Sequence, residues 1–169
     1  MKFVLLNGAS CSGKSTVVKR VLKDKAGYYQ VSYDALKWGF SQYKPDKHFE
    51  EVRKLMRALT EAVCVMEYNI ICDSGLFKET RDKLFEIAQK YNYEIIEINL
   101  EAPYEVLVER FDKRVAEAAA GGGRVTNTSK ERHKELFDIY ESEKNLHAIT
   151  YHTDKQSIDE VAEAVLKLL

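Results

Sequence analysis

Apolar residues along this chain fall into two kinds of segment that alternate with each other. Short, nearly continuous apolar runs lie at positions 3–6, 28–32, 70–72, 94–100 and 148–151. Runs of this length with little polar interruption are typical of strands that are buried on both faces of a sheet. The pattern therefore predicts five strands.

Between these runs, apolar residues recur every three or four positions, as they do on one face of a helix. Such stripes cover 15–24, 49–67, 79–90 and 157–169. Two further helices are expected: one begins at Pro103, and one begins at Thr128, which forms a capping box with Glu131. The alternation of strands and helices predicts an α/β sandwich around a mostly parallel sheet, with the loops that bind ligands gathered on one edge.

The chain is expected to form one domain over residues 1–169, because this length suits a single core and no linker or repeat interrupts the pattern. The segment 116–128 is rich in glycine and small polar residues, and it lies between two predicted helices. This composition predicts a lid that closes over a bound ligand.

A glycine-rich loop follows the first predicted strand. Positions 8–15 read GASCSGKS, which fits G-x-x-x-x-G-K-[ST] at every fixed position. A buried strand precedes the loop and a helix follows it, which is the context that separates a phosphate-binding loop from a chance glycine-rich turn. We therefore expect a P-loop that binds ATP with Mg²⁺. The residues expected to contact the nucleotide phosphates are Gly8, Ala9, Ser10, Cys11, Ser12, Gly13, Lys14, Ser15 and Thr16.

The residue types of this loop suit its expected task. Glycines let backbone N–H groups approach phosphate oxygens, and the positive end of the following helix dipole points at the same anion. Lys14 is expected to reach the β and γ phosphates, the Ser15 hydroxyl to bind Mg²⁺, and Thr16 to touch the α phosphate.

Two aspartates follow other predicted strands. Asp73 ends the strand 70–72 and would complete the magnesium shell, although a loop aspartate that caps the next turn, with Ser74 and Gly75 beside it, is the alternative. P-loop ATPases commonly have a glutamate at the next position to activate water, so the presence of Ser74 there favours transfer to a bound acceptor over hydrolysis. Asp34 follows the second strand and would accept the proton of an acceptor hydroxyl, or else it is the N-cap of a short helix that begins at Ala35.

Three arginines lie in or next to the predicted lid. Arg110 and Arg114 share one helix face, and Arg124 lies within 116–128. Arginines that close on the transferring phosphate would stabilise its charge. The alternative is a solvated helix face on which Arg110 pairs with Glu105 or Glu109.

Composition limits the class of protein. Charged residues make up 31% of the chain with both signs interspersed, and the net charge is −1. This balance argues against a protein that coats nucleic acid or a membrane. The three cysteines have no metal-ligand spacing, so they are expected to be reduced thiols in a cytoplasmic protein. No membrane span is expected, and the protein is expected to be a monomer or a homodimer.

Taken together, these motifs resemble those of the small P-loop kinases, in particular the branch of chloramphenicol phosphotransferase and polynucleotide 5′-kinase. The resemblance covers nearly the whole chain and rests on 8–16, 32–34, 70–73 and 100–114. It implies a three-layer P-loop fold with a five-stranded parallel sheet of order 2-3-1-4-5.

The resemblance also implies roles for particular residues. Asp34 would be the base, Arg110 would lie near the adenine or the phosphates, and Arg114 would contact phosphate. The loop with Thr153 and Asp154 would pass by the adenine. The segment 37–48, with its aromatic residues, matches no known acceptor signature.

These observations favour an ATP-dependent phosphotransferase that acts on a hydroxyl. Lys14, Asp34, Arg110 and Arg114 are the expected catalytic residues, and Ser15 and Asp73 the expected metal ligands. The aromatic residues around Trp38 favour a small-molecule acceptor over the 5′ end of a nucleic acid. A nucleoside monophosphate kinase and a non-catalytic ATP-binding regulatory module are the alternatives.

Overall fold

The computed structural model describes residues 1–75, 77–122, 125 and 127–169. Strands and helices alternate along the chain, as the apolar pattern predicts. The strands are β1 (Lys2–Asn7), β2 (Tyr28–Val31), β3 (Asn69–Cys72), β4 (Glu94–Glu101) and β5 (Ile149–His152). The helices are α1 (Lys14–Asp24), α2 (Tyr33–Lys37), α3 (Pro45–Val65), α4 (Lys78–Lys90), α5 (Tyr104–Ala119), α6 (Lys130–Glu143) and α7 (Ile158–Leu166).

The five strands form one parallel sheet in the order β2-β3-β1-β4-β5, which confirms the predicted fold. β1 lies at the centre, paired with β3 on one side and β4 on the other. Because the strands are parallel, the loops that follow them lie at the same edge of the sheet. The predicted P-loop and both predicted aspartates therefore come from that edge.

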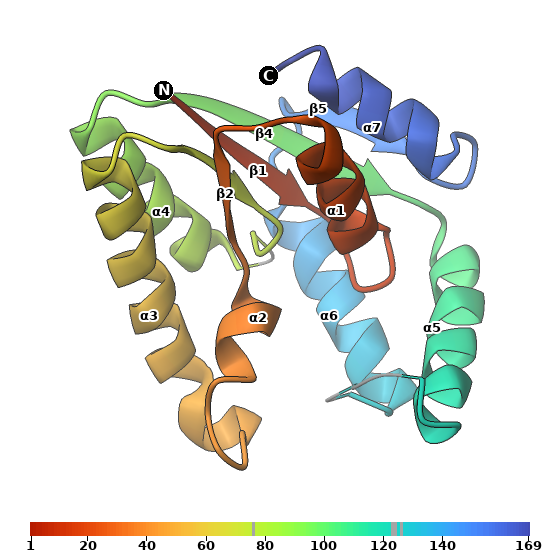
Figure 1. Cartoon of the computed structure of the whole chain (residues 1–169). Helices are drawn as coiled ribbons and strands as arrows, with labels where there is room; N and C mark the ends of the chain where they lie inside the picture. Colours follow the sequence, from red (N-terminus) through yellow and green to blue (C-terminus); the bar gives the residue numbers. More distant parts are fainter. Residues whose placement is uncertain (76, 123–124, 126) are drawn as a thin grey trace.

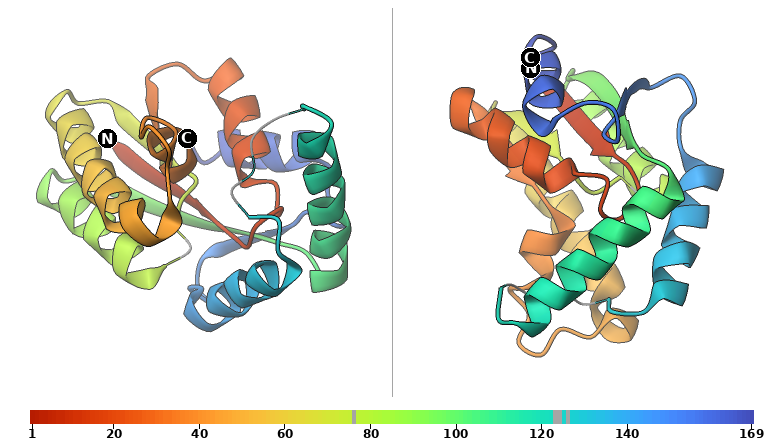
Figure 2. Two further views of the ribbon diagram at one scale, coloured as in Figure 1. Left: turned by 90° about the horizontal axis from the view of Figure 1, so that it is seen from below. Right: turned by 90° about the vertical axis from the view of Figure 1, so that its right-hand side faces the viewer.

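Two helical layers cover the sheet, and alternating residues of β1 point into one or the other. Phe3 and Leu5 pack with residues of α3 and α4, whereas Val4 and Leu6 pack with residues of α1 and α7. Figures 1 and 2 show these two pairs of helices on opposite sides of the sheet, with α5 and α6 beyond its carboxyl edge. Burial of β1 on both faces explains why its sequence is a continuous apolar run.

Several element boundaries differ from those predicted. α6 is capped by Ser129, whose hydroxyl oxygen accepts a hydrogen bond from the Arg132 N–H at 3.2 Å. The capping box predicted for Thr128 and Glu131 is therefore wrong by one position: the Ser129 hydroxyl donates to Glu131 Oε2 instead. Pro103 precedes the first helical residue of α5 rather than being that residue, because its ψ of 146° is extended.

The predicted lid, 116–128, begins within a helix. α5 continues to Ala119, so the first four residues of the segment are helical. Gly121 follows in a turn with a φ of 88°, a left-handed conformation that glycine adopts without strain. In the described part of the chain, no helix is both long and apolar enough to cross a bilayer.

Candidate functional site

The loop between β1 and α1 has the backbone shape that the phosphate-binding motif requires. Gly8 and Gly13 have φ values of 151° and 98°, which favour glycine. A side chain at Gly8 would place its Cβ only 2.5 Å from the Leu100 carbonyl oxygen, so β4 excludes any larger residue there. Gly13 is the N-cap of α1, and the amide-rich start of that helix faces the loop.

Lys14 lies folded over the same loop. Its Nζ donates hydrogen bonds to the carbonyl oxygens of Gly8, at 2.7 Å, and Ala9, at 2.8 Å. Burial lowers the pKa of Lys14 from its ordinary value to about 8, although the nearby charges of Asp73 and Asp34 act in the opposite direction. The ammonium is thus held within the P-loop by two of the loop's own backbone carbonyl oxygens.

Ser15 and Asp73 are 58 residues apart in sequence and in direct contact in the structure. The Ser15 hydroxyl donates to Asp73 Oδ2 at 2.7 Å, and Asp73 is buried at the end of β3. The Ser74 hydroxyl and the Gln30 side-chain amide also donate to this carboxylate, at 3.3 and 3.5 Å. The carboxylate therefore faces the P-loop.

This pair of oxygen ligands fits magnesium. Mg²⁺ prefers oxygen ligands and usually keeps water and substrate phosphate in its shell, with one or two protein ligands. Among the described residues, no cluster of three or more histidine, cysteine or acidic side chains could enclose a metal ion. One hydroxyl and one carboxylate beside the phosphate-binding loop leave the remaining positions to nucleotide and water.

Asp34 lies in the first turn of α2, just after β2. The N-cap of α2 is Ser32, so the alternative that Asp34 caps a helix beginning at Ala35 is wrong. Its side chain is exposed and forms an ion pair with Lys37, one turn later, whose side chain is buried. Asp34 lies near enough to Lys14 for its charge to raise the pKa of that lysine.

Arg110 connects α5 with two loops. One of its nitrogens donates to the Thr153 hydroxyl at 3.0 Å and the other to the Thr153 carbonyl at 2.6 Å. It also donates to the carbonyl of Cys11 in the P-loop at 3.4 Å. Its partners are therefore not Glu105 or Glu109, which excludes the solvated-face alternative for this residue.

The remaining predicted site residues lie near the P-loop on α1, on α5 and in the loop after β5. Thr16 is exposed in the first turn of α1, and Asp154 is exposed next to buried Thr153. Arg114 is exposed on α5, one turn beyond Arg110, and its charge lowers the pKa of Lys14. Arg124 lies outside the described residues.

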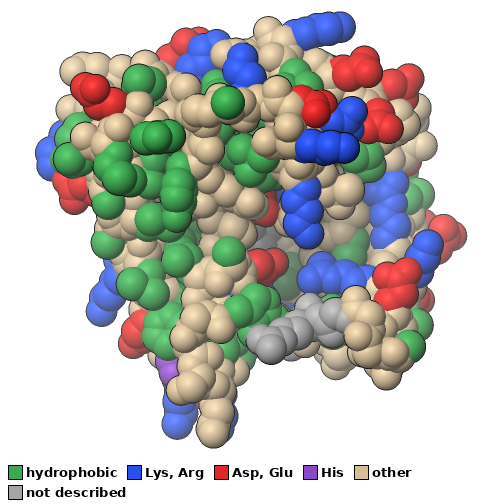
Figure 3. Space-filling view, viewed as in Figure 1, with side chains coloured by type: hydrophobic (Ala, Val, Ile, Leu, Met, Phe, Trp, Pro, Cys, Tyr) green, Lys and Arg blue, Asp and Glu red, His purple; other side chains and the backbone are tan. Residues whose placement is uncertain are grey.

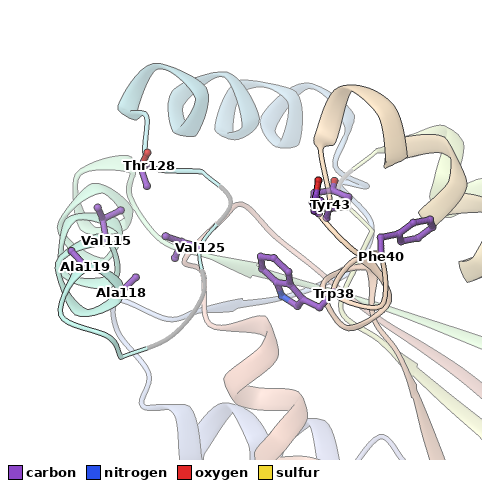
Figure 4. Close-up of a pocket in the computed structure, with 9 residues that line it drawn as sticks. Trp38, Phe40, Tyr43, Val115, Ala118, Ala119, Val125 and Thr128 are labelled. Atoms are coloured by element: carbon purple, nitrogen blue, oxygen red, sulfur yellow. The ribbon is translucent and has the colours of Figure 1, made fainter.

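A cavity of about 570 Å³ opens between the end of α2 and the last turns of α5. Figure 3 shows lysine and arginine side chains gathered beside the hollow at this edge of the sheet. In Figure 4, Trp38 extends from the end of α2 toward Val125, and Val115 and Ala118 project from α5. Aromatic and aliphatic side chains dominate its lining.

Two features of the site are absent from the sequence-based expectations. Lys37 had no expected role, although its spacing of three residues from Asp34 within one helix could have indicated the ion pair. The contribution of Val115 to the cavity wall was not expected, because it lies before the predicted lid 116–128, which supplies Ala118 and Thr128 to the same wall.

Comparison with known proteins agrees with this architecture. The model of the AAA domain family matches residues 3–142. No curated protein matches the chain in sequence. A protein from Chloroflexus aurantiacus superposes with a TM-score of 0.73 at 17% identity, covering 99% of this chain and 98% of its own.

Two structures of named kinases have the same fold. The APS kinase of Mycobacterium tuberculosis, in complex with AMPPNP and APS, has a TM-score of 0.64 at 21% identity, covering 99% of this chain and 96% of its own. A gluconokinase from Sinorhizobium meliloti has a TM-score of 0.62 at 21% identity, covering 98% and 90%. The predicted resemblance to small P-loop kinases is thus confirmed at the level of the fold.

Proposed function

This chain belongs to the AAA domain family, and from that premise we propose that it is an ATP-dependent phosphotransferase that moves the γ-phosphate to the hydroxyl of a small molecule. The observation that carries the proposal is the placement of Asp34, a carboxylate at the same sheet edge as the P-loop and close enough to influence Lys14. A hydrolase or a nucleotide switch would not need a second carboxylate beside an open cavity.

Each residue of the proposed site has a separate role in the reaction. The P-loop amides and Lys14 bind the β and γ phosphates, and Arg114 approaches from α5 to stabilise charge on the transferring group. The oxygen of the acceptor hydroxyl bonds to the γ-phosphorus, and the bond from that phosphorus to the leaving ADP oxygen breaks. Asp34 accepts the proton that the hydroxyl loses in this step. Magnesium held by Ser15 and Asp73 would neutralise phosphate charge when bound. Arg110 and Thr153 would position the adenine side of the nucleotide.

The Asp34–Lys37 ion pair orients the proposed base. Lys37 is buried, so its ammonium is fixed, and it holds the exposed Asp34 carboxylate by one oxygen. In the proposed reaction this contact would limit the rotation of the carboxylate that receives the proton. We infer that Lys37 acts as a positioning residue for Asp34.

Replacing Asp34 with asparagine tests the proposal. We expect Asp34→Asn to lower transfer to a hydroxyl acceptor by about 10²- to 10⁴-fold while the affinity for MgATP stays near that of the unmodified protein. Transfer of radiolabelled γ-phosphate to a panel of alcohols measures the first quantity, and calorimetric titration with MgATP measures the second.

The matched control is Asp46→Asn, which removes another exposed aspartate from the first turn of a helix, here α3. This variant should transfer phosphate normally. Release of free phosphate only, at a rate unaffected by Asp34→Asn, would contradict the proposal. Full activity of Asp34→Asn toward a nucleoside monophosphate would instead indicate a nucleoside monophosphate kinase.

A further inference from the structure

Helix α3 is apolar on two different faces. Its inner face packs into the core through Met56 and Val63. Its outer face carries four exposed apolar residues, here called the outer seam: Leu55, Ala58, Ala62 and Val65. Figure 3 shows hydrophobic side chains gathered on the side of the molecule where α3 lies. A surface helix usually has one apolar face, turned to the core, and a polar face turned to water. The outer seam therefore indicates a face that a partner covers.

The spacing of the outer seam is that of a helix that packs against another helix. Its residues are three, four and three positions apart, which matches alternating a and d positions of a heptad. The larger side chains lie at the two ends, where Leu55 is 44% exposed and Val65 is 64% exposed. The two central residues are alanines, whose short side chains let two helix backbones approach closely. The seam is therefore shaped for a second helix.

The outer seam is complementary to a second copy of itself. When two identical helices run antiparallel about a two-fold axis, each a position faces a d position of the other helix. Leu55 then faces Val65 of the second copy, and Ala58 faces its Ala62. Large side chains meet large ones and alanines meet alanines, so the two helices pack at an even distance along the seam.

The charged residues beside the seam favour this antiparallel arrangement. Lys54 and Glu61 lie on the same flank of α3, seven residues apart. In an antiparallel pair this flank meets the same flank of the second copy, so each Lys54 lies opposite a Glu61. In a parallel pair it would meet the other flank, where Leu59 and Met66 carry no charge. Only the antiparallel pair therefore forms ion pairs across the seam.

Both charged groups can take part in such a contact. Lys54 is exposed, and no acidic side chain among the described residues forms an ion pair with it. Glu61 bonds to Lys90 at 2.7 Å and to the Tyr91 hydroxyl at 3.1 Å, both through Oε1. Its Oε2 therefore remains for a cation from a second copy.

From these observations we propose that α3 is a self-association surface, on which two copies of this chain form an antiparallel helix pair about a two-fold axis between Ala58 and Ala62. The seam extends over about 15 Å of helix axis, which is short for a protein interface. We therefore expect a reversible dimer with a dissociation constant on the order of micromolar. This inference does not depend on the proposed phosphoryl transfer.

Sedimentation equilibrium over about 1–200 µM protein, without nucleotide, measures this association. We expect the mean mass to rise with concentration from the 19.5 kDa of one chain toward twice that value. Ala62→Lys places a charge at the centre of the seam and should weaken association at least about tenfold. Ala116→Lys makes the same change at an exposed position of α5 and should leave association unchanged. Thermal unfolding followed by circular dichroism verifies that both variants fold.

An exchange of charges tests the antiparallel arrangement. Lys54→Glu should weaken association, because it places a glutamate opposite Glu61 of the second copy at two symmetric positions. Adding Glu61→Lys to the same chain should restore most of the affinity, because opposite charges then meet again. Lys19→Glu makes the first change at an exposed lysine of α1 and should have no effect.

Three results would overturn the inference: a mass of 19.5 kDa at every concentration, association that is insensitive to Ala62→Lys, or no recovery in the variant with exchanged charges. A chain that stayed monomeric and cosedimented with vesicles of phosphatidylserine and phosphatidylcholine would also overturn it, in favour of a membrane as the occupant of this face. None of these measurements uses nucleotide or turnover, so a failure of the proposed phosphoryl transfer would appear separately, in the radiolabel assay.

Discussion

Lys14 shows how one side chain can combine binding and sensitivity to pH. Its ammonium bonds to the carbonyl oxygens of Gly8 and Ala9, and burial lowers its pKa to about 8. A bound triphosphate would supply negative charge and raise that pKa again. If Lys14 binds the phosphates as proposed, its protonation is therefore coupled to nucleotide binding.

This coupling predicts a pH dependence of ATP affinity. Below about pH 8 the ammonium is already protonated in the free protein, so affinity should be nearly constant. Above that pH the free protein must take up a proton when it binds ATP, so affinity should fall by up to about tenfold per pH unit. Calorimetry at about pH 9 in two buffers of different ionisation enthalpy measures the proton uptake directly.

The control for this effect is Lys14→Arg, whose guanidinium stays charged throughout the range. Its affinity for ATP, whatever its absolute value, should not change between about pH 7 and pH 9. If the unmodified protein took up no proton at the higher pH, the link between burial of Lys14 and nucleotide affinity would be wrong.

At the scale of elements, a buried ion pair joins α4 to β4 and to the loop after β3. Arg81 Nε lies 3.3 Å from Glu97 Oε1, and both side chains are almost fully buried. Arg81 also donates to the carbonyl oxygens of Gly75 and Glu143, at 3.3 and 2.8 Å. Because Gly75 lies two residues beyond Asp73, this pair supports the segment that carries the proposed metal ligand.

Removal of one partner of the Arg81–Glu97 ion pair should destabilise the folded protein. Arg81→Met leaves the Glu97 carboxylate buried without its cation, and we expect the free energy of unfolding to fall by about 3–5 kcal/mol. Adding Glu97→Met to the same chain should recover much of that loss, because no buried charge then remains. Urea unfolding measures both variants.

An exposed ion pair provides the comparison. Arg20 bonds to Asp159 at 2.8 Å on the surface between α1 and α7. Arg20→Ala should lower the free energy of unfolding much less than Arg81→Met does, because solvent screens the exposed pair. Equal losses in Arg81→Met and Arg20→Ala would show that burial does not control the contribution of Arg81.

At the scale of the whole molecule, Arg110 holds together segments that are far apart in sequence. It extends from α5 to Thr153, 43 residues later, and to the carbonyl of Cys11, 99 residues earlier. The P-loop, the helix that leads to the predicted lid, and the loop after β5 therefore meet at one guanidinium. A change at this residue should alter the nucleotide site more than overall stability.

A substitution at Arg110 tests whether this residue contributes to binding of the nucleoside part of ATP or of its phosphates. Arg110→Lys keeps the charge but loses the forked geometry that binds both oxygens of Thr153. We expect affinity for ATP to fall about five- to tenfold, with affinity for tripolyphosphate nearly unchanged. Arg132→Lys, at an exposed position of α6, should alter neither quantity. Equal losses for both ligands would place Arg110 at the phosphates rather than at the loop of Thr153.

Much of the fold could be predicted from the sequence because its signals are local. The five apolar runs and the intervening helical stripes match the observed elements to within a few residues. The errors fall at boundaries such as Ser129, where neighbouring residues can each serve as the cap and only the final backbone conformation selects one.

The features of the candidate site also fall into two groups: those that the sequence identifies and those that only the structure shows. By itself the sequence determined the phosphate-binding loop, because its glycines, lysine and serine are consecutive and act through their own backbone. Only the tertiary structure decided that the Ser15 hydroxyl donates directly to Asp73, two residues that the sequence had assigned to one metal ion, that Lys37 is buried against Asp34, and that Val115 lines a cavity with Trp38. Those contacts depend on strand order and helix packing. The number of residues between two positions in the chain does not indicate how far apart the two side chains lie in the folded protein.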